Sequence, residues 1–138
     1  MSTTFTDISS ALDSRLSTFA GGDPVAWPNI EFTPDTQTLF LRPSILPVAT
    51  EQIGLGNDGF DIHRGIYQVD IVAMAGEGRG AAEAKADAVA NHFARGTDLS
   101  YNGLSVRLGD VSRNQGINVG DRFVISLSID YLVHTAPR

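Results

Sequence analysis

The last part of the chain alternates strictly between apolar and polar residues, and this pattern constrains the fold more than any other. Every second position is apolar, at Phe123, Ile125, Leu127, Ile129, Tyr131 and Val133. The polar residues between them include Arg122, Ser126, Ser128 and Asp130. Because successive side chains of a strand point to opposite faces, the pattern predicts a long strand with one buried and one polar face. Such strands are typical of antiparallel sheets.

Two helices are predicted elsewhere in the chain. The first spans residues 4–19, because apolar residues recur there at steps of three and four and two glycines follow. These apolar residues are Phe5, Ile8, Leu12, Leu16 and Phe19. The second helix spans residues 81–93 and is rich in alanine. Its expected buried stripe consists of Ala82, Ala86, Val89, Ala90 and Phe93.

Further strands are predicted at residues 39–46, 66–74 and 104–108. Residues 111–114 are a candidate for another short strand, followed by a loop over residues 115–121. Pro43 lies inside the first of these and confines it to a sheet edge or interrupts it. The element order is helix, strand, strand, helix and then two or three strands. We therefore expect an α+β fold: a mostly antiparallel sheet of four to five strands with two helices packed on one face.

At 138 residues, the chain has the length of a single domain over residues 1–138. Residues 47–64 contain several glycines and are predicted to form a long loop or arm, which is too apolar for a plain solvated linker. It either becomes ordered against a partner or is disordered. Trp27 lies in a proline-rich connection, where a large aromatic side chain most often covers the edge of a core.

The composition excludes several classes of function. The chain has no cysteine, so thiol nucleophiles, disulfides and cysteine metal sites are ruled out. Its net charge is −6, with one lysine, which argues against nonspecific binding of nucleic acid. Residues 1–60 hold seven acidic and two basic groups and so concentrate the negative charge. No signal peptide or membrane span is visible, and we expect the protein to begin in the cytoplasm.

A glycine-rich segment superficially matches a dinucleotide-binding fingerprint. Gly76 and Gly78 precede Ala81 in the pattern G-x-G-x-x-A, and Asp98 follows about twenty residues later. The fingerprint requires a strand–helix–strand unit with parallel strands, and Asp98 falls in a turn. A flexible turn between strand and helix is the favoured interpretation. A small ligand- or nucleotide-binding domain using Gly76–Gly80 stays open as an alternative from a different class.

No metal or catalytic constellation is found in the sequence. The three histidines, His63, His92 and His134, lack a ligand spacing, although two of them could meet in space. Residues 57–61 hint at a calcium loop, but glycines occupy the places of its outer ligands. We expect no catalytic residue, no bound metal and no cofactor.

Several short motifs occur in order along nearly the whole chain. They are Val25-Ala-Trp-Pro-Asn29, Phe32-Thr-Pro34, Leu41-Arg-Pro43, Gly65-Ile-Tyr-Gln-Val-Asp70, Gly76-x-Gly78, Ala86-Asp87 and Phe93 with Arg95-Gly96, followed by the long terminal strand. With them the chain resembles the small tail-terminator, or tail-completion, proteins of long-tailed bacteriophages and prophages. The resemblance implies an α+β subunit without catalytic residues.

The resemblance also implies a ring, typically a hexamer, at the head-proximal end of the tail tube. Such a ring stops growth of the tube and offers the docking surface for the head. Its partners are other copies of itself, the tail-tube protein and the head–tail connector protein, and DNA passes through its lumen without specific binding. The implied location is the virion tail, after assembly in the host cytoplasm. A neck or head-completion protein is the alternative within the same biology.

Six residues are candidate contacts with a partner or with the lumen: Glu51, Asp58, Phe60, Asp61, Ile117 and Val119. The three acidic ones are selected because an acidic lumen repels phosphate, although any solvated loop would carry the same residues. The others lie in residues 47–64 and 116–120, which are the candidate regions for contacts with tube or connector. The helix at 81–90 and the strand around Pro43 are candidates for the subunit interface, with plain core packing as the alternative.

Overall fold

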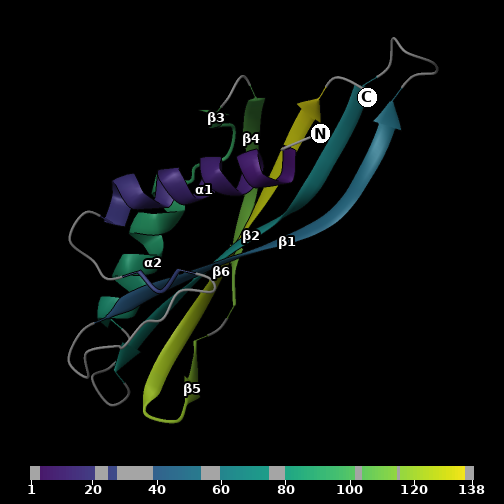
Figure 1. Cartoon of the computed structure of the whole chain (residues 1–138). Coiled ribbons are helices and arrows are strands. Elements are labelled where there is room, and N and C mark those ends of the chain that lie inside the picture. Colours follow the sequence, from purple (N-terminus) through teal and green to yellow (C-terminus); the bar gives the residue numbers. More distant parts are fainter. Residues whose placement is uncertain are drawn as a thin grey trace.

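The computed structural model describes residues 4–20, 25–27, 39–53, 60–74, 80–101, 104–114 and 116–135. It contains two helices and six strands (Figure 1). The helices are α1 (Thr4–Ala20) and α2 (Gly80–His92). The strands are β1 (Phe40–Ile53), β2 (Phe60–Met74), β3 (Asp98–Tyr101), β4 (Leu104–Arg113), β5 (Ile117–Val119) and β6 (Arg122–Thr135).

The strands form one sheet in the order β1-β2-β6-β4-β3, with β5 paired to β6, and each of these pairings is antiparallel. The α+β prediction is confirmed, but the sheet has six strands instead of four to five. The additional strands arise at tight turns. Gly120 has a φ of +61°, which allows a two-residue turn in which Val119 pairs with Arg122. Residues 117–119, predicted as part of a loop, therefore form β5.

Residues 47–64 differ most from the predicted structure, which was a long loop or arm. Residues 47–53 and 60–64 are not a loop, because β1 and β2 pair from Phe40 opposite Val72 to Ile53 opposite Phe60. The expected arm is therefore a long β-hairpin, whose strands continue past the helices in Figure 1. Residues 54–59 lie outside the described part of the chain.

Strand β1 contains two prolines, Pro43 and Pro47, and continues past both of them. The carbonyl of Leu41 accepts a hydrogen bond from the backbone N–H of Ala26 at 2.7 Å, so odd-numbered residues of β1 direct their backbone groups away from β2. Pro43 and Pro47 share this parity, and their missing N–H groups therefore cost no hydrogen bond to β2. A bulge between Pro47 and Ala49 shifts the register, so that Pro47 pairs with Gly65 and Ala49 pairs with Arg64. The prediction that Pro43 marks a sheet edge is confirmed.

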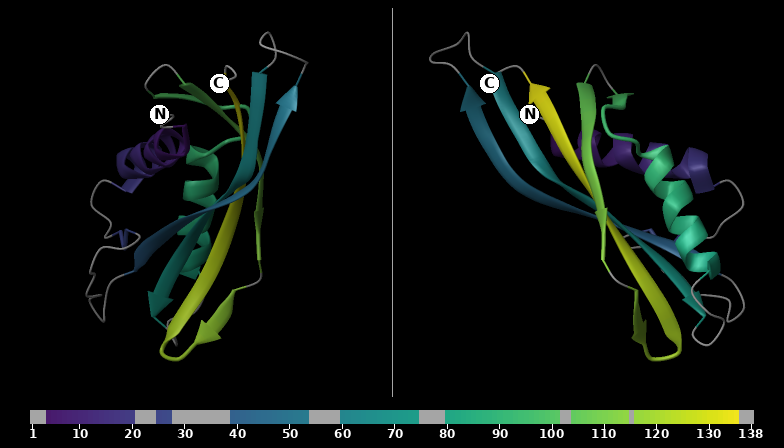
Figure 2. Two further views of the ribbon diagram at one scale, coloured as in Figure 1. Left: turned by 45° about the vertical axis from the view of Figure 1, so that its right-hand side comes forward. Right: turned by 180° about the vertical axis from the view of Figure 1, so that it is seen from behind.

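One main core cluster joins both helices to the sheet. Figure 2 shows the helices and the sheet in two further views. Strands β2 and β6 contribute odd-numbered residues, such as Tyr67 and Ile129, whereas β4 contributes the even-numbered Val106 and Leu108. Most of the apolar stripe of each helix is buried as expected, at Ile8, Leu12, Leu16, Ala82, Ala86 and Val89. Phe5, the first residue of the predicted α1 stripe, is instead 54% exposed, and its ring contacts that of His63. Helix α1 contacts β3 and β4, while α2 contacts β2 and β6. Trp27 packs partly buried against this cluster, which confirms its predicted role.

Candidate interaction surfaces

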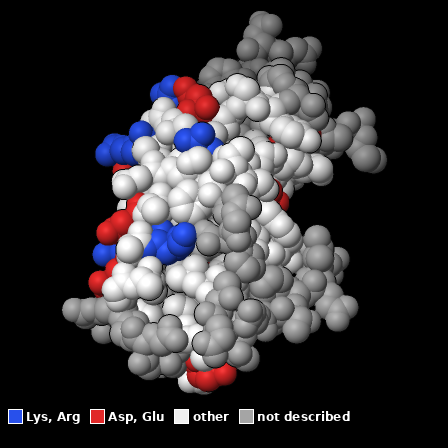
Figure 3. Space-filling model, turned by 90° about the vertical axis from the view of Figure 1, so that its left-hand side faces the viewer, with Lys and Arg blue, Asp and Glu red and all other residues white. Residues whose placement is uncertain are grey.

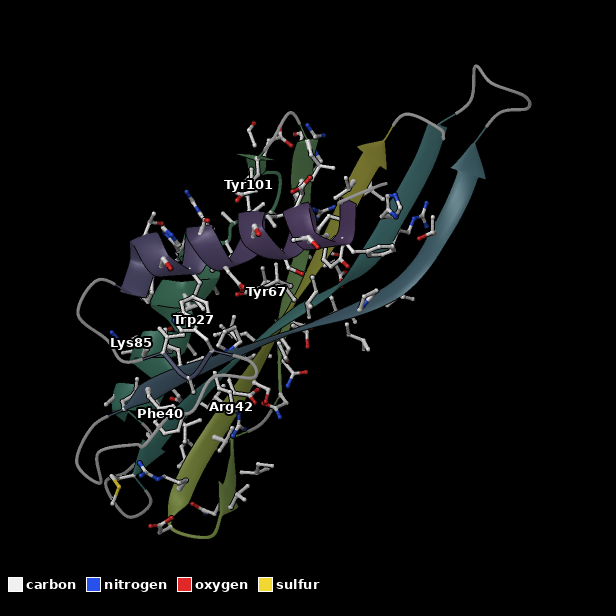
Figure 4. All side chains as sticks on the ribbon, in the orientation of Figure 1. Trp27, Phe40, Arg42, Tyr67, Lys85 and Tyr101 are labelled. Carbon is white, nitrogen blue, oxygen red and sulfur yellow. The ribbon has the colours of Figure 1, made fainter. Side chains whose placement is uncertain are left out.

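A polar cluster occupies the centre of the sheet face that carries the even-numbered residues of β1, β2 and β6, which we call the second face. Asp70 accepts hydrogen bonds from Arg42 Nη2 at 2.9 Å, Gln68 Nε2 at 2.9 Å and Ser126 Oγ at 2.7 Å (Figure 4). Asp70 is only 8% exposed. Since a buried carboxylate is costly without donors, this cluster ties the three adjacent strands together and keeps the middle of the second face polar.

One end of the second face is apolar and carries the short strand β5. Phe40, Val72 and Val124 lie opposite one another on three adjacent strands and are buried. On β5, Ile117 and Val119 are 52% and 57% exposed. The side chain of Asp121, in the turn after β5, is 81% exposed. We call Ile117, Val119 and Asp121 the β5 tip.

The other end of the second face holds a groove on the long hairpin. Its volume is about 390 Å³, and we call it the hairpin groove. It is lined by Val48, Arg64, Gly65, Ile66, Gly109, Asp130, Tyr131 and Leu132. Val48 is 63% exposed, and Leu46 beside it is 60% exposed. Gly109 keeps the groove open, because a Cβ there would lie 3.2 Å from Cβ of Asp130.

A larger groove of about 520 Å³ runs beside α1. Three of its lining residues, Trp27, Tyr67 and Tyr101, are labelled in Figure 4. It is lined by Ser9, Ser10, Asp13, Ser14, Ser17, Trp27, Ser44, Ile45, Tyr67 and Tyr101. The Tyr67 hydroxyl donates to Asp13 Oδ1 at 2.7 Å. Burial raises the pKa of Asp13, against a smaller opposing effect of this hydrogen bond, and burial together with Asp13 raises the pKa of Tyr67. The phenol therefore stays protonated, and the pair serves as a tie between α1 and β2.

Helix α1 is also attached to the end of α2. The Arg15 guanidinium donates to the carbonyl of His92 from Nε at 3.0 Å and from Nη2 at 2.7 Å. A cation is favourable at this position because the last carbonyls of a helix carry partial negative charge. His92 is thus engaged in joining the helices, with its ring Nε2 2.9 Å from the carbonyl of Arg15.

The structure does not favour the nucleotide-binding alternative. Gly76 and Gly78 lie outside the described residues, and Gly80 is the first residue of α2. The strand after α2 is β3, which pairs antiparallel with β4, so the parallel strand–helix–strand unit that the fingerprint requires is not formed by β2, α2 and β3. Among the described residues, no group of three acidic or histidine side chains is placed to hold a metal ion.

Charges of both signs are mixed on the face that Figure 3 shows. Three exposed ion pairs connect α2, β3, β4 and the turn between α2 and β3: Arg95–Asp110, Arg107–Asp98 and Arg113–Asp87. The hydrogen bond from Arg107 lowers the pKa of Asp98 and raises that of the guanidinium. Pairs this exposed contribute little to stability. Where they lie, among the described residues of α2, β3 and β4, positive charge is balanced by negative charge, which does not favour binding of nucleic acid.

Five of the six candidate residues have described backbone positions, in two groups at opposite ends of the sheet. Ile117 and Val119 are brought together as exposed neighbours on β5. Glu51, Phe60 and Asp61 take positions in the hairpin strands, where Glu51 is opposite Ile62 and Asp61 is opposite Gln52. The side chains of these three, and all of Asp58, lie outside what the structure describes.

The hairpin groove was not predicted from the sequence. Its apolar lining could have been found only by treating residues 46–48 and 64–66 as paired strands, which places Leu46 opposite Ile66. The stripe of α2, by contrast, belongs to the core, so the plain packing alternative holds for Ala82, Ala86 and Val89.

Comparison with known families decides the class of the protein. A family model described as phage tail terminator protein matches residues 7–131. The chain belongs to the phage tail terminator family. This family is structural and non-enzymatic, and it confirms the resemblance found in the sequence. A search of curated protein sequences found no match to this chain.

Two solved structures resemble this tail terminator in fold. One chain without a functional name is 30% identical, with a TM-score of 0.77, covering 95% of this chain and 96% of its own length. A chain from the virion of a native gene transfer agent particle is 19% identical, with a TM-score of 0.57, covering 91% and 92%. The second similarity is one of fold.

Neither described helix has the length and apolar character needed to span a membrane.

Proposed function

We propose that this protein forms a ring, a hexamer, at the head-proximal end of a phage tail tube. The ring terminates polymerisation of the tube and provides the surface on which the head docks. The observation that carries the proposal is the match of the tail terminator family to residues 7–131, which leaves only short segments at either end. The partners are further copies of this chain, the tail-tube protein and the head–tail connector protein.

We also infer that both helices cover the odd-numbered face of the sheet and leave the second face for assembly. The main core cluster supports this arrangement, because it contains side chains of both helices, odd-numbered residues of β2 and β6, and the β4 residues Val106 and Leu108 paired with Val133 and Tyr131. The second face has a polar centre and apolar residues at each end, among them Leu46, Val48, Ile117 and Val119. Exposed aliphatic side chains gathered in this way are typical of surfaces that a partner covers.

The negative charge of the chain suits a passage for DNA. Residues 1–60 carry a net charge of −5, and Glu51, Asp58 and Asp61 are our candidates for lumen positions. Acidic groups repel the phosphates, so DNA slides without being held, the opposite of binding by release of counterions. The similar chain from a gene transfer agent virion belongs to a particle of this general kind, which supports a location in the virion.

The mass of the assembled protein tests the proposal. Native mass spectrometry and light scattering should give a mass near six subunits at high concentration or with the tail-tube protein present. A protein that stays monomeric and does not bind tube ends contradicts the proposal. A protein that binds the portal complex, but not tube ends, is instead a neck or head-completion protein.

A further inference from the structure

We propose that neighbouring subunits join head to tail, with the β5 tip of one copy seated in the hairpin groove of the next. This inference rests on the proposed ring and assigns its subunit contact. It commits both exposed apolar ends of the second face to a second copy of this chain. The tail-tube and connector proteins must then bind elsewhere on the ring.

The two surfaces match in shape and polarity. The β5 tip projects Ile117 and Val119, each more than half exposed. The hairpin groove is a hollow of about 390 Å³ with Val48 and Leu132 in its lining. Branched aliphatic side chains seated in an apolar hollow exclude water from both surfaces, as the central residues of stable interfaces do.

The charges at the margins are also complementary. Arg64 lines the groove and is exposed, and no described residue forms an ion pair with it. Asp121 at the β5 tip is 81% exposed, and among the described residues its ion-pair contact is with Arg122 at 3.9 Å. Asp130 also lines the groove and is exposed, and its charge has the same sign as that of Asp121. The tip must therefore enter with Asp121 toward Arg64 and away from Asp130. Docking would place Asp121 near Arg64, which fixes the orientation of the tip.

The fold prevents the tip from reaching the groove of its own chain. The β5 tip pairs with the first residues of β6, where Ile117 lies opposite Val124. The groove lies near the far end of β6, at Asp130 to Leu132. Figure 1 shows β5 and the hairpin at opposite ends of the long sheet. A contact between two different patches on identical chains is heterologous, and it produces a ring when the rotation between copies closes.

The prolines of β1 argue for a contact through side chains instead of a shared sheet. β1 is an edge strand, and Pro43 and Pro47 occupy positions whose backbone groups point outward. An incoming strand would find two hydrogen-bond donors missing along this edge. Prolines on an edge strand are a common protection against strand-to-strand association.

Mixing two variants tests the proposal directly. Val48→Asp disables the groove and Val119→Asp disables the tip, so each variant alone should lose the ring, with its association weakened by at least roughly tenfold. A 1:1 mixture should form dimers and nothing larger, because the intact tip of Val48→Asp fits the intact groove of Val119→Asp. Ala88→Asp, on an exposed position of α2, is the matched control and should keep the wild-type mass.

A charge exchange gives a second and independent test. Arg64→Asp and Asp121→Arg should each weaken the ring, and the double variant should restore it, since every contact then has the pair reversed. Sedimentation velocity and native mass spectrometry report the masses, and circular dichroism confirms that each variant is folded.

The outcomes separate this inference from the proposed function. Rings of wild-type mass from Val48→Asp and Val119→Asp overturn the contact but leave the ring intact. Folded monomeric variants that fail to form dimers on mixing overturn the head-to-tail pairing and favour the tube or connector protein as occupant of these surfaces. A wild-type protein that is monomeric even with the tail-tube protein refutes both proposals.

Discussion

The polar cluster around Asp70 allows a quantitative test of how the sheet is held together. Asp70 has two structurally different partners on adjacent strands. Ser126 donates at 2.7 Å, while Arg42 donates at 2.9 Å from a side chain that is 52% exposed. We predict that the uncharged partner contributes more to stability than the charged one.

The magnitudes follow from burial. A hydrogen bond to a buried carboxylate contributes about 1.5–3 kcal/mol, whereas an ion pair with an exposed guanidinium contributes about 0.2–1 kcal/mol. Asp70→Ala removes the acceptor for both of them and for Gln68, so the total loss should be about 3 kcal/mol. For a domain of this size, that loss lowers the melting temperature by roughly 10 °C.

Two double-mutant cycles measure the separate couplings. Urea unfolding at constant protein concentration should give a larger coupling energy for Asp70→Ala with Ser126→Ala than for Asp70→Ala with Arg42→Ala. Ser128→Ala, at a neighbouring position of the same face, is the control and should change stability by less than about 0.5 kcal/mol. A coupling with Arg42 equal to or above that with Ser126 would refute the reasoning from burial.

Two further predictions concern the other side of the sheet. Gly65→Ala should destabilise the protein by about 1–3 kcal/mol in urea unfolding, because the new Cβ would lie 2.6 Å from Cζ of Tyr131. Gly80→Ala, with no atom within 4 Å of its Cβ, is the control, and an equal loss there would contradict the packing argument. Asp13→Asn should remove a pH dependence of stability. Burial raises the pKa of Asp13 in the folded state, so its protonation favours folding. Wild type should therefore gain stability relative to Asp13→Asn as the pH falls through that raised pKa, and the gain is lost as the pH rises again. A difference that does not change with pH would show that the carboxyl hydrogen-bonded to Tyr67 is not desolvated.

The helices and the terminal strand were predictable because each depends on local patterns. In α1, apolar residues spaced three and four apart face the core, and in β6 every second residue does. Each pattern can therefore be recognised within its own segment of the sequence. The family could also be inferred, since the short motifs that carry the resemblance occur along nearly the whole chain, and the family model matches residues 7–131.

The long hairpin was not predictable, because its cause is not local. Pro47 and the glycines of residues 47–64 favour a loop, but pairing with β2 and the outward parity of the prolines override that preference. The hairpin groove depends on the same pairing, since it joins Val48 with Leu132 across the sheet. Contacts between residues so far apart in sequence leave no periodic signal in either segment.

The length of tail tubes assembled with this protein tests the central claim most directly. The tail-tube protein should be polymerised with and without the chain, and the tubes measured by electron microscopy. The proposal predicts that tubes stop growing in its presence and carry one ring of density at one end. Tubes of unchanged length without a terminal ring would contradict the proposal.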